Sequence, residues 1–311
     1  MQNLKMSWQS DDLNMKERLS HLMTSRQMTD VTLIIGQEKE YFPTRSLLLS
    51  IHSEVFHAMF YGPLAEKRKN VTLPDDDAKA FRVFIKYIYT EEVALHSVDE
   101  AIRSLHFAEK YMVTRMKNQC LSHLTNHIWP DTVLEIYEAA SQLQQNELTM
   151  ECWMYITDNM SEIIKRDSIK NVKYETILKL VSVDCLVLKS EVDMYDAVIK
   201  WGKERFQDQS PEDLRKKLEP LLDQIRFLSM TPAEFAESPC QDGILTKDEQ
   251  VDIFREIATK KNYENNNIRD QWRKPRQIIA TLKMCTPRNE YNRYMRYPYV
   301  EWEAEGLEAL Y

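Results

Sequence analysis

Among the seven histidines and five cysteines of this sequence, one histidine pair and the cysteines could take part in metal binding or nucleophilic chemistry. His123 and His127 are four residues apart on a predicted helix, a spacing that allows two imidazoles to reach one metal ion. Leu124, however, occupies the position at which a helical zinc protease needs its glutamate. We therefore interpret the histidine pair as part of a partly exposed helix face.

The cysteines are odd in number, widely separated and never arranged as CxxC: Cys120, Cys152, Cys185, Cys240 and Cys285. This pattern predicts reduced thiols in a cytosolic or nuclear protein, and neither a disulfide framework nor a zinc site. Free cysteines most often pack as small apolar side chains. We expect no catalytic thiol, no metal and no cofactor.

Glycine-rich catalytic loops are also missing. The 311 residues contain only five Gly, and no Walker loop, GxSxG or GxGxxG motif is present. The acidic run in "PDDDAKAF" is interpreted as favourable negative charge at a helix N-terminus. The sequence therefore predicts a protein that is not an enzyme.

Charge and hydropathy exclude two further classes of partner. The formal net charge is -8, whereas nucleic-acid binding needs a basic surface. No run of 18 apolar residues is present, and the first residues lack the apolar core of a signal peptide. We expect no nucleic acid and no membrane as partners, and a location in the cytoplasm or the nucleus.

The spacing of apolar residues predicts a mainly α fold with a small mixed sheet. Short strands are expected at residues 31–35, at residues 41 and 42 before Pro43, and in "NVTLPD". A single long helix is expected over "RSLLLSIHSEVFHAMF", and further helices fill the rest of residues 28–128. The small number of glycines likewise disfavours an all-β fold.

Pro130 marks the expected start of a second, all-helical domain. Thr132 and Glu135 have capping-box spacing, and helices are predicted near 147–165, 173–182, 190–206, 211–223 and 246–260. After Asn265 the tail is first basic, then acidic and rich in aromatic residues. The tail is open to several interpretations: a disordered or loosely docked extension, an added helix or strand, or a partner-binding segment.

Residues 28–128 resemble a BTB/POZ domain, and residues 129–262 resemble the BACK domain of cullin-3 substrate adaptors. The resemblance is carried by "DVTLII", "YFPTRSLLLSIHSEVFHAMF" and "NVTLPDDDAKAFRVFIKYIYTEEV", followed by "CWMYI", "AVIKWGKE" and "MTPAEFAE". The whole is similar to the BTB-BACK-PHR subfamily. It implies an α/β BTB domain followed by an all-α BACK domain, flanked by an N-terminal dimerisation helix in residues 1–27 and a tail in residues 263–311.

Two features depart from that family's pattern. BTB domains usually place Ala-His after the Phe-Pro pair, whereas this chain has Thr44 and Arg45. The residues after the BACK-like region are also too few, with Gly306 as their single glycine, for the subfamily's PHR β-sandwich. We therefore expect the PHR module to be missing or replaced.

The resemblance also implies two binding surfaces. The family's cullin-binding signature is an apolar residue, any residue, then Glu, which corresponds here to Leu64-Ala65-Glu66. The alternative is an ordinary surface loop. Neighbouring apolar surface for cullin-3 is expected from Met59, Phe60 and Tyr111.

An amphipathic helix precedes the BTB-like region. Its apolar stripe either packs on its own core or, as in similar BTB domains, crosses a twofold homodimer interface, which is the interpretation we favour. The stripe consists of Met15, Leu19, Leu22 and Met23.

The resemblance implies a substrate adaptor of a cullin-3 ubiquitin ligase that dimerises and holds an unknown protein substrate near the ligase. Two alternatives remain. The chain could be a self-associating scaffold or transcription-associated BTB protein, or a short regulatory form that competes for cullin-3.

Overall fold

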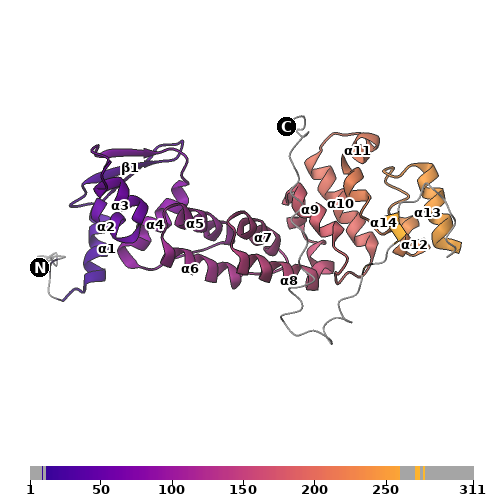
Figure 1. Cartoon of the computed structure of the whole chain (residues 1–311), viewed down its shortest axis with the longest axis horizontal. Coiled ribbons are helices and arrows are strands. Elements are labelled where there is room, and N and C mark those ends of the chain that lie inside the picture. Colours follow the sequence, from indigo (N-terminus) through magenta and orange to yellow (C-terminus); the bar gives the residue numbers. More distant parts are fainter. Residues whose placement is uncertain (1–8, 10–11, 260–269, 274–275, 277–311) are drawn as a thin grey trace, which may run out of the picture. The chain divides into compact units, whose positions relative to one another are not determined.

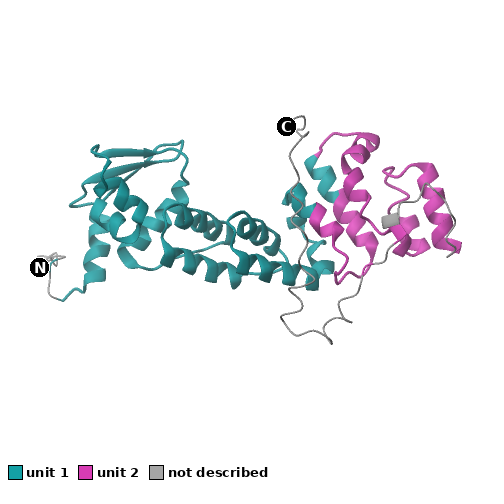
Figure 2. Ribbon diagram, in the orientation of Figure 1, with its two compact units in different colours: residues 1–177, 200–205 teal, residues 178–199, 206–311 magenta. Residues whose placement is uncertain are grey.

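The computed structural model describes residue 9, residues 12–259 and 270–273, and residue 276. The chain divides into two compact units, with residues 1–177 and 200–205 in unit 1 and residues 178–199 and 206–311 in unit 2 (Figure 2). The expected domain boundary at Pro130 falls inside unit 1.

Unit 1 begins with helix α1 (Met15–Ser25), followed by a three-stranded mixed sheet (Figure 1). β1 (Val31–Ile35) lies between antiparallel β2 (Glu40–Thr44) and parallel β3 (Asn70–Leu73). β2 continues through Pro43, so the expectation that Pro43 ends the strand is wrong. β2 is an edge strand, where a residue without an N–H group is tolerated.

The expected long helix is broken into α2 (Ser46–His52) and α3 (Glu54–Tyr61). Ser53 has extended backbone angles at the break, and its hydroxyl accepts the Phe56 N–H at 3.1 Å. The same hydroxyl donates to the Tyr111 carbonyl at 2.6 Å. These bonds satisfy the ends of two helices at once, which a continuous helix would not allow.

The core of unit 1 is aromatic. It is enclosed by α4 (Ala78–Thr90), α5 (Val98–Lys110) and α6 (Thr114–Thr125), and α5 packs on both of the others. Phe56 lies at its centre and its ring stacks on those of Phe84 and Tyr111, with centroids 5.7 and 4.5 Å apart. Phe81 and Phe107 are also buried and contact each other edge to face.

Two further helices of unit 1 extend this packing. α7 (Val133–Gln142) packs on α5, and α8 (Asn146–Ile163) packs on both α6 and α7, followed by the short helix η1 (Asp167–Asn171). The capping box expected at Thr132 is wrong, because its hydroxyl donates to the His127 carbonyl at 2.6 Å and does not cap α7. Helices α9 (Tyr174–Ser182) and α10 (Glu191–Arg205) follow close to their predicted positions.

Unit 2 contains residues 178–182 of α9, residues 191–199 of α10 and the remaining described helices. These remaining helices are α11 (Pro211–Leu222), η2 (Phe227–Ser229), α12 (Pro232–Glu237), α13 (Lys247–Thr259) and α14 (Asp270–Arg273). α14 belongs to the predicted tail and packs on η2, whereas most of that tail lies outside the described residues. The mainly helical fold with a small mixed sheet is confirmed. In the described part of the chain, no helix is both long enough and apolar enough to cross a bilayer.

Candidate partner-binding surfaces

The loop after α3 is held by its own backbone. The Gly62 N–H donates to the Ala58 carbonyl at 3.1 Å, and the Glu66 N–H donates to the Met59 carbonyl at 2.8 Å. A Cβ atom at Gly62 would approach the Ala58 oxygen to 2.4 Å, so only glycine fits this close turn. The loop therefore leaves α3 in a defined direction.

This geometry exposes the side chains of the predicted cullin-binding signature. Leu64 is 97% exposed, although a leucine usually loses solvent contact in a folded protein. Glu66 is also exposed, and its carboxylate accepts the Arg68 N–H at 2.9 Å, which orients it within the loop. The arrangement presents an apolar side chain and a carboxylate, two residues apart, on a hydrogen-bonded turn.

The three residues expected beside the loop have different environments. Met59 and Phe60 are half-buried on α3, and the Phe60 ring stacks on Phe56 with centroids 6.2 Å apart. Tyr111 is only 2% exposed, and its hydroxyl donates to Asp76, itself buried. The expectation that Tyr111 supplies accessible surface is wrong, because this side chain belongs to the core.

A groove of about 700 Å³ runs along α2, α3 and the start of α6. Its lining combines exposed apolar side chains with charged ones, including the Arg115–Glu91 ion pair at 2.5 Å. His52 lies in the same wall, and burial, the largest effect, lowers its pKa. Sequence spacing does not reveal this groove, because its walls come from three separate parts of the chain, near residues 50–57, 87–91 and 112–115.

Met112 in the groove wall has an unusual backbone conformation. It follows the C-cap of α5 with φ of 55°, in the left-handed region that favours glycine. The Met112 N–H donates to the Glu109 carbonyl and the Val113 N–H donates to the Ala108 carbonyl, so the helix ends in a Schellman motif. Its side chain is 57% exposed. A strained backbone thus presents a large apolar side chain to solvent.

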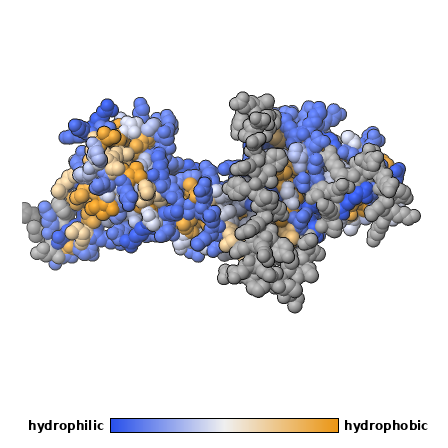
Figure 3. All heavy atoms as spheres, in the orientation of Figure 1, coloured by the Kyte–Doolittle hydropathy of each residue, from blue (hydrophilic) through white to orange (hydrophobic). Residues whose placement is uncertain are grey.

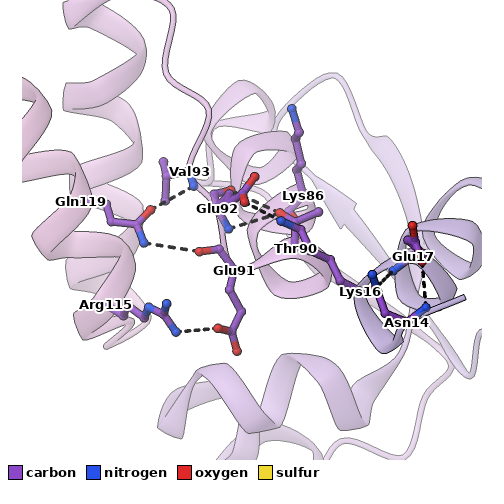
Figure 4. A network of polar contacts seen from close by, with 10 residues as sticks. All are labelled: Asn14, Lys16, Glu17, Lys86, Thr90, Glu91, Glu92, Val93, Arg115 and Gln119. Atoms are coloured by element: carbon purple, nitrogen blue, oxygen red, sulfur yellow. Dashed lines mark hydrogen bonds and ion pairs between the residues drawn. The ribbon is translucent and has the colours of Figure 1, made fainter.

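Helix α1 forms polar contacts with the rest of unit 1 at both of its ends. Near its N-terminus, Lys16 forms an ion pair with Glu92, just after α4, and Asn14 and Glu17 form a capping box (Figure 4). Figure 4 also shows Arg115 and Gln119 of α6 joined to residues 91 and 93, which follow α4. These bonds connect the end of α4 to its two neighbouring helices.

Arg45 holds the other end of α1. Its guanidinium donates to the Leu22 carbonyl at 3.1 Å and also to the Gln27 carbonyl and the Tyr89 hydroxyl. Arg45 is itself buried and lies over the Tyr89 ring at 5.4 Å. The departure from the family's Ala-His pattern thus has a structural role, because a shorter side chain could not reach all three acceptors.

The predicted dimer stripe remains accessible on the single chain. No residue of α1 is buried, Met15 is 68% exposed, and Leu19, Leu22 and Met23 are intermediate. On α2, one turn apart, Leu47 and Ile51 are 60% and 64% exposed. Hydrophobic residues gather over this part of unit 1 in the face shown by Figure 3.

Within the described residues, the cysteines and the histidine pair lie in separate environments. Burial raises the pKa of both the Cys120 and Cys152 thiols to about 12, so both are protonated at neutral pH. The His123 and His127 rings stack with centroids 4.1 Å apart. Across the residues described by the structure, no group of three or more His, Cys, Asp or Glu side chains is placed to hold a metal ion.

Comparison with known proteins identifies the two parts of the chain. A BTB/POZ domain model matches residues 19–128, and a model described as BTB And C-terminal Kelch (BACK) matches residues 133–238. Together they account for more than half of the sequence. Domains of the BTB type mediate protein–protein interaction and dimerisation in general.

Curated relatives show the same relationship. BTB/POZ domain-containing protein 3 of Homo sapiens is 29% identical over 80% of this chain and 48% of its own length. BTB/POZ domain-containing protein 6 of Xenopus tropicalis is 28% identical over the same shares, and protein 6-A of Danio rerio is 30% identical over 80% and 47%. The chain thus spans about half the length of the curated relatives it matches. On its two matched domains and these relatives, the chain belongs to the BTB/POZ proteins that carry a BACK domain.

Proposed function

We propose that this protein is a non-catalytic adaptor of a cullin-3 ubiquitin ligase. The BTB domain dimerises and binds cullin-3, the BACK domain extends that contact, and another part of the protein holds a protein substrate. The chemistry belongs to other subunits, and the adaptor accelerates it by proximity. The reduced thiols are in keeping with a location in the cytoplasm or the nucleus.

The observation that carries this proposal is the exposure of Leu64 on its hydrogen-bonded loop. A fully exposed leucine on a constrained turn can fill an apolar pocket with little loss of conformational freedom. Glu66 lies two residues away, as the family's signature requires. The groove beside α3 offers further apolar area through Met112.

The proposed homodimer rests on a separate surface. Leu19 and Leu22 on α1 and Leu47 and Ile51 on α2 are apolar side chains that this chain leaves partly or largely exposed. Covering them with the same face of a second copy would remove them from water and repeat each contact twice. Two copies would give the ligase two substrate positions and add avidity.

Cullin binding is tested with the full chain and the N-terminal region of cullin-3. Burying one leucine contributes about 1.5–3 kcal/mol, so replacing it with a charge should weaken binding at least about 100-fold. We expect the double variant Leu64→Asp, Glu66→Lys to lose co-purification and to keep the size of the wild-type dimer in gel filtration. Tyr41→Asp with Glu38→Lys is the matched control, because both residues are exposed and belong to neither proposed surface.

Equal binding by the double variant and the wild type would refute the proposed contact. Loss of binding by the control variant as well would mean that charge reversal anywhere is disruptive and that the loop is not special. Wild-type dimers with no measurable cullin complex would instead favour the second candidate, a scaffold that only self-associates. The exposed apolar face of α1 and α2 is the observation that favours this second candidate.

A further inference from the structure

Beyond α13, residues 270–273 and Arg276 contact other elements of unit 2. We call these residues the anchor. Trp272 of the anchor is 1% exposed, and its indole N–H donates to the Leu222 carbonyl at 3.1 Å. The Trp272 ring lies edge-on to that of Phe227, with centroids 5.0 Å apart. A buried tryptophan whose N–H has a hydrogen-bond acceptor indicates a specific packing contact.

Two arginines of the anchor meet two buried carboxylates. Arg273 donates through both terminal nitrogens to the two oxygens of Glu256 on α13, at 2.7 and 2.9 Å. Arg276 forms an ion pair with Glu191, at the start of α10, and donates to the Val183 carbonyl. Glu256 and Glu191 are each 6% exposed. A buried carboxylate needs such a partner, and a bidentate guanidinium is the strongest available.

Four separate elements therefore form one seat for the anchor: Glu191 on α10, Leu222 on α11, Phe227 on η2 and Glu256 on α13. The seat offers an aromatic wall, a carbonyl acceptor and two carboxylates. The anchor offers an indole and two guanidinium groups in the order Trp-Arg-x-x-Arg. The indole contacts the aromatic wall and the carbonyl, and each guanidinium pairs with one carboxylate.

We propose that this seat is a binding site for a Trp-Arg-x-x-Arg segment and that the anchor is its intramolecular ligand. Docking places residue 276 beside Glu191 on α10. Ten residues, 260–269, join α13 to the anchor. A tether of this length gives an effective concentration of about 1 mM, so the attached segment outcompetes a free one. This inference does not depend on cullin binding.

Hydrogen exchange in the full chain tests the proposal. We expect the indole N–H of Trp272 to be protected in the wild type, because it is buried and donates to the Leu222 carbonyl. Arg273→Glu places a carboxylate against Glu256 and should lower that protection at least about tenfold, since a hydrogen bond to a charged group is lost. The double variant Glu256→Arg, Arg273→Glu restores the pair in reverse and should recover most of the protection. Arg255→Glu, on an exposed neighbour of Glu256, is the control.

A second measurement uses a fluorescent peptide with the sequence of residues 268–278. It should bind the Arg273→Glu chain, whose seat is vacated, at least about tenfold more tightly than the wild type, whose seat is occupied. The exchanged-charge double variant should not bind it. If Arg273→Glu removes protection throughout unit 2, the milder Arg273→Gln replaces it in both measurements.

Three results would overturn the proposal. The first is exchange of the Trp272 indole N–H in the wild type at the rate of an unstructured peptide. The second is unchanged protection in the Arg273 variant, or no recovery in the charge exchange. The third is equal binding of the peptide to the wild type and the variant, or binding to neither.

Discussion

Replacing Arg45 with methionine should release helix α1 from the BTB domain while the sheet beside it stays folded. Methionine has a similar length and fills the buried space, but it cannot donate to the carbonyls of Leu22 and Gln27 or to Tyr89. No residue of α1 is buried. Its attachment therefore depends on the Arg45 hydrogen bonds, the Lys16–Glu92 ion pair and the half-buried apolar stripe.

The magnitude follows from the Arg45 contacts. A hydrogen bond to a charged group contributes about 1.5–3 kcal/mol, and Arg45 makes three. The cost of burying the guanidinium offsets part of this sum, and the two backbone carbonyls return to water when α1 opens. We expect a net loss of about 2 kcal/mol, which corresponds to an opening constant for α1 about 30-fold larger.

Hydrogen exchange resolved by segment is the appropriate assay, because a chain with two units need not unfold in a single step. In Arg45→Met, the amides of α1 should exchange about 30-fold faster, whereas those of β1 should keep their wild-type rates. The dissociation constant of the proposed dimer should rise by a similar factor, since an undocked α1 must be ordered again before it can pair.

The reasoning is refuted if α1 exchanges at the same rate in Arg45→Met and in the wild type. Arg82→Met is the matched control, because Arg82 also forms an ion pair, with Glu40, but its side chain is 55% exposed. An exposed ion pair contributes only about 0–1 kcal/mol, so this control should leave α1 unchanged. Equal acceleration in both variants would show that loss of any arginine loosens the domain.

Two further predictions concern the groove and the thiols. Met112→Gly should stabilise unit 1 by about 0.5–1 kcal/mol in denaturant melts, because glycine accepts the left-handed conformation. The proposed cullin-3 binding should weaken, because an exposed apolar side chain is lost. A drop in stability would contradict the strain at Met112. At pH 8, alkylation of Cys120 should be about 1,000-fold slower in the folded chain than in the unfolded chain, since its pKa is raised by burial from 9.0 to about 12 and the thiolate is the reactive form. Mass spectrometry of labelled peptides measures both rates, and a folded Cys120 that reacts as fast as the unfolded one would contradict this burial.

Local spacing was sufficient for most secondary structure. The alternation of Val31, Leu33 and Ile35 predicted β1, and helical periodicity predicted most of the helices. These patterns succeed because a strand or an amphipathic helix repeats the same burial every few residues. The proposed cullin-binding signature was also visible in the sequence, because Leu64 and Glu66 are close in sequence and belong to one turn.

The errors come from contacts between distant residues. Ser53 divides the expected helix because it bonds to the carbonyl of Tyr111, 58 residues away. Tyr111 was expected at the surface, yet its aromatic ring lies against Phe56 and its hydroxyl against Asp76 in the core. A periodic pattern contains no information about which partner a side chain will meet.

The sequence by itself determined the class of the protein: a mainly helical BTB/POZ and BACK chain with a leucine and a glutamate in its signature loop. Only the tertiary structure decided that Leu64 is fully exposed, that Arg45 holds α1 and that Trp272 docks 50 residues from its acceptor at Leu222. The physical reason is that a short-range pattern reports the shape of each element, whereas exposure and pairing depend on how elements distant in sequence fill the same space.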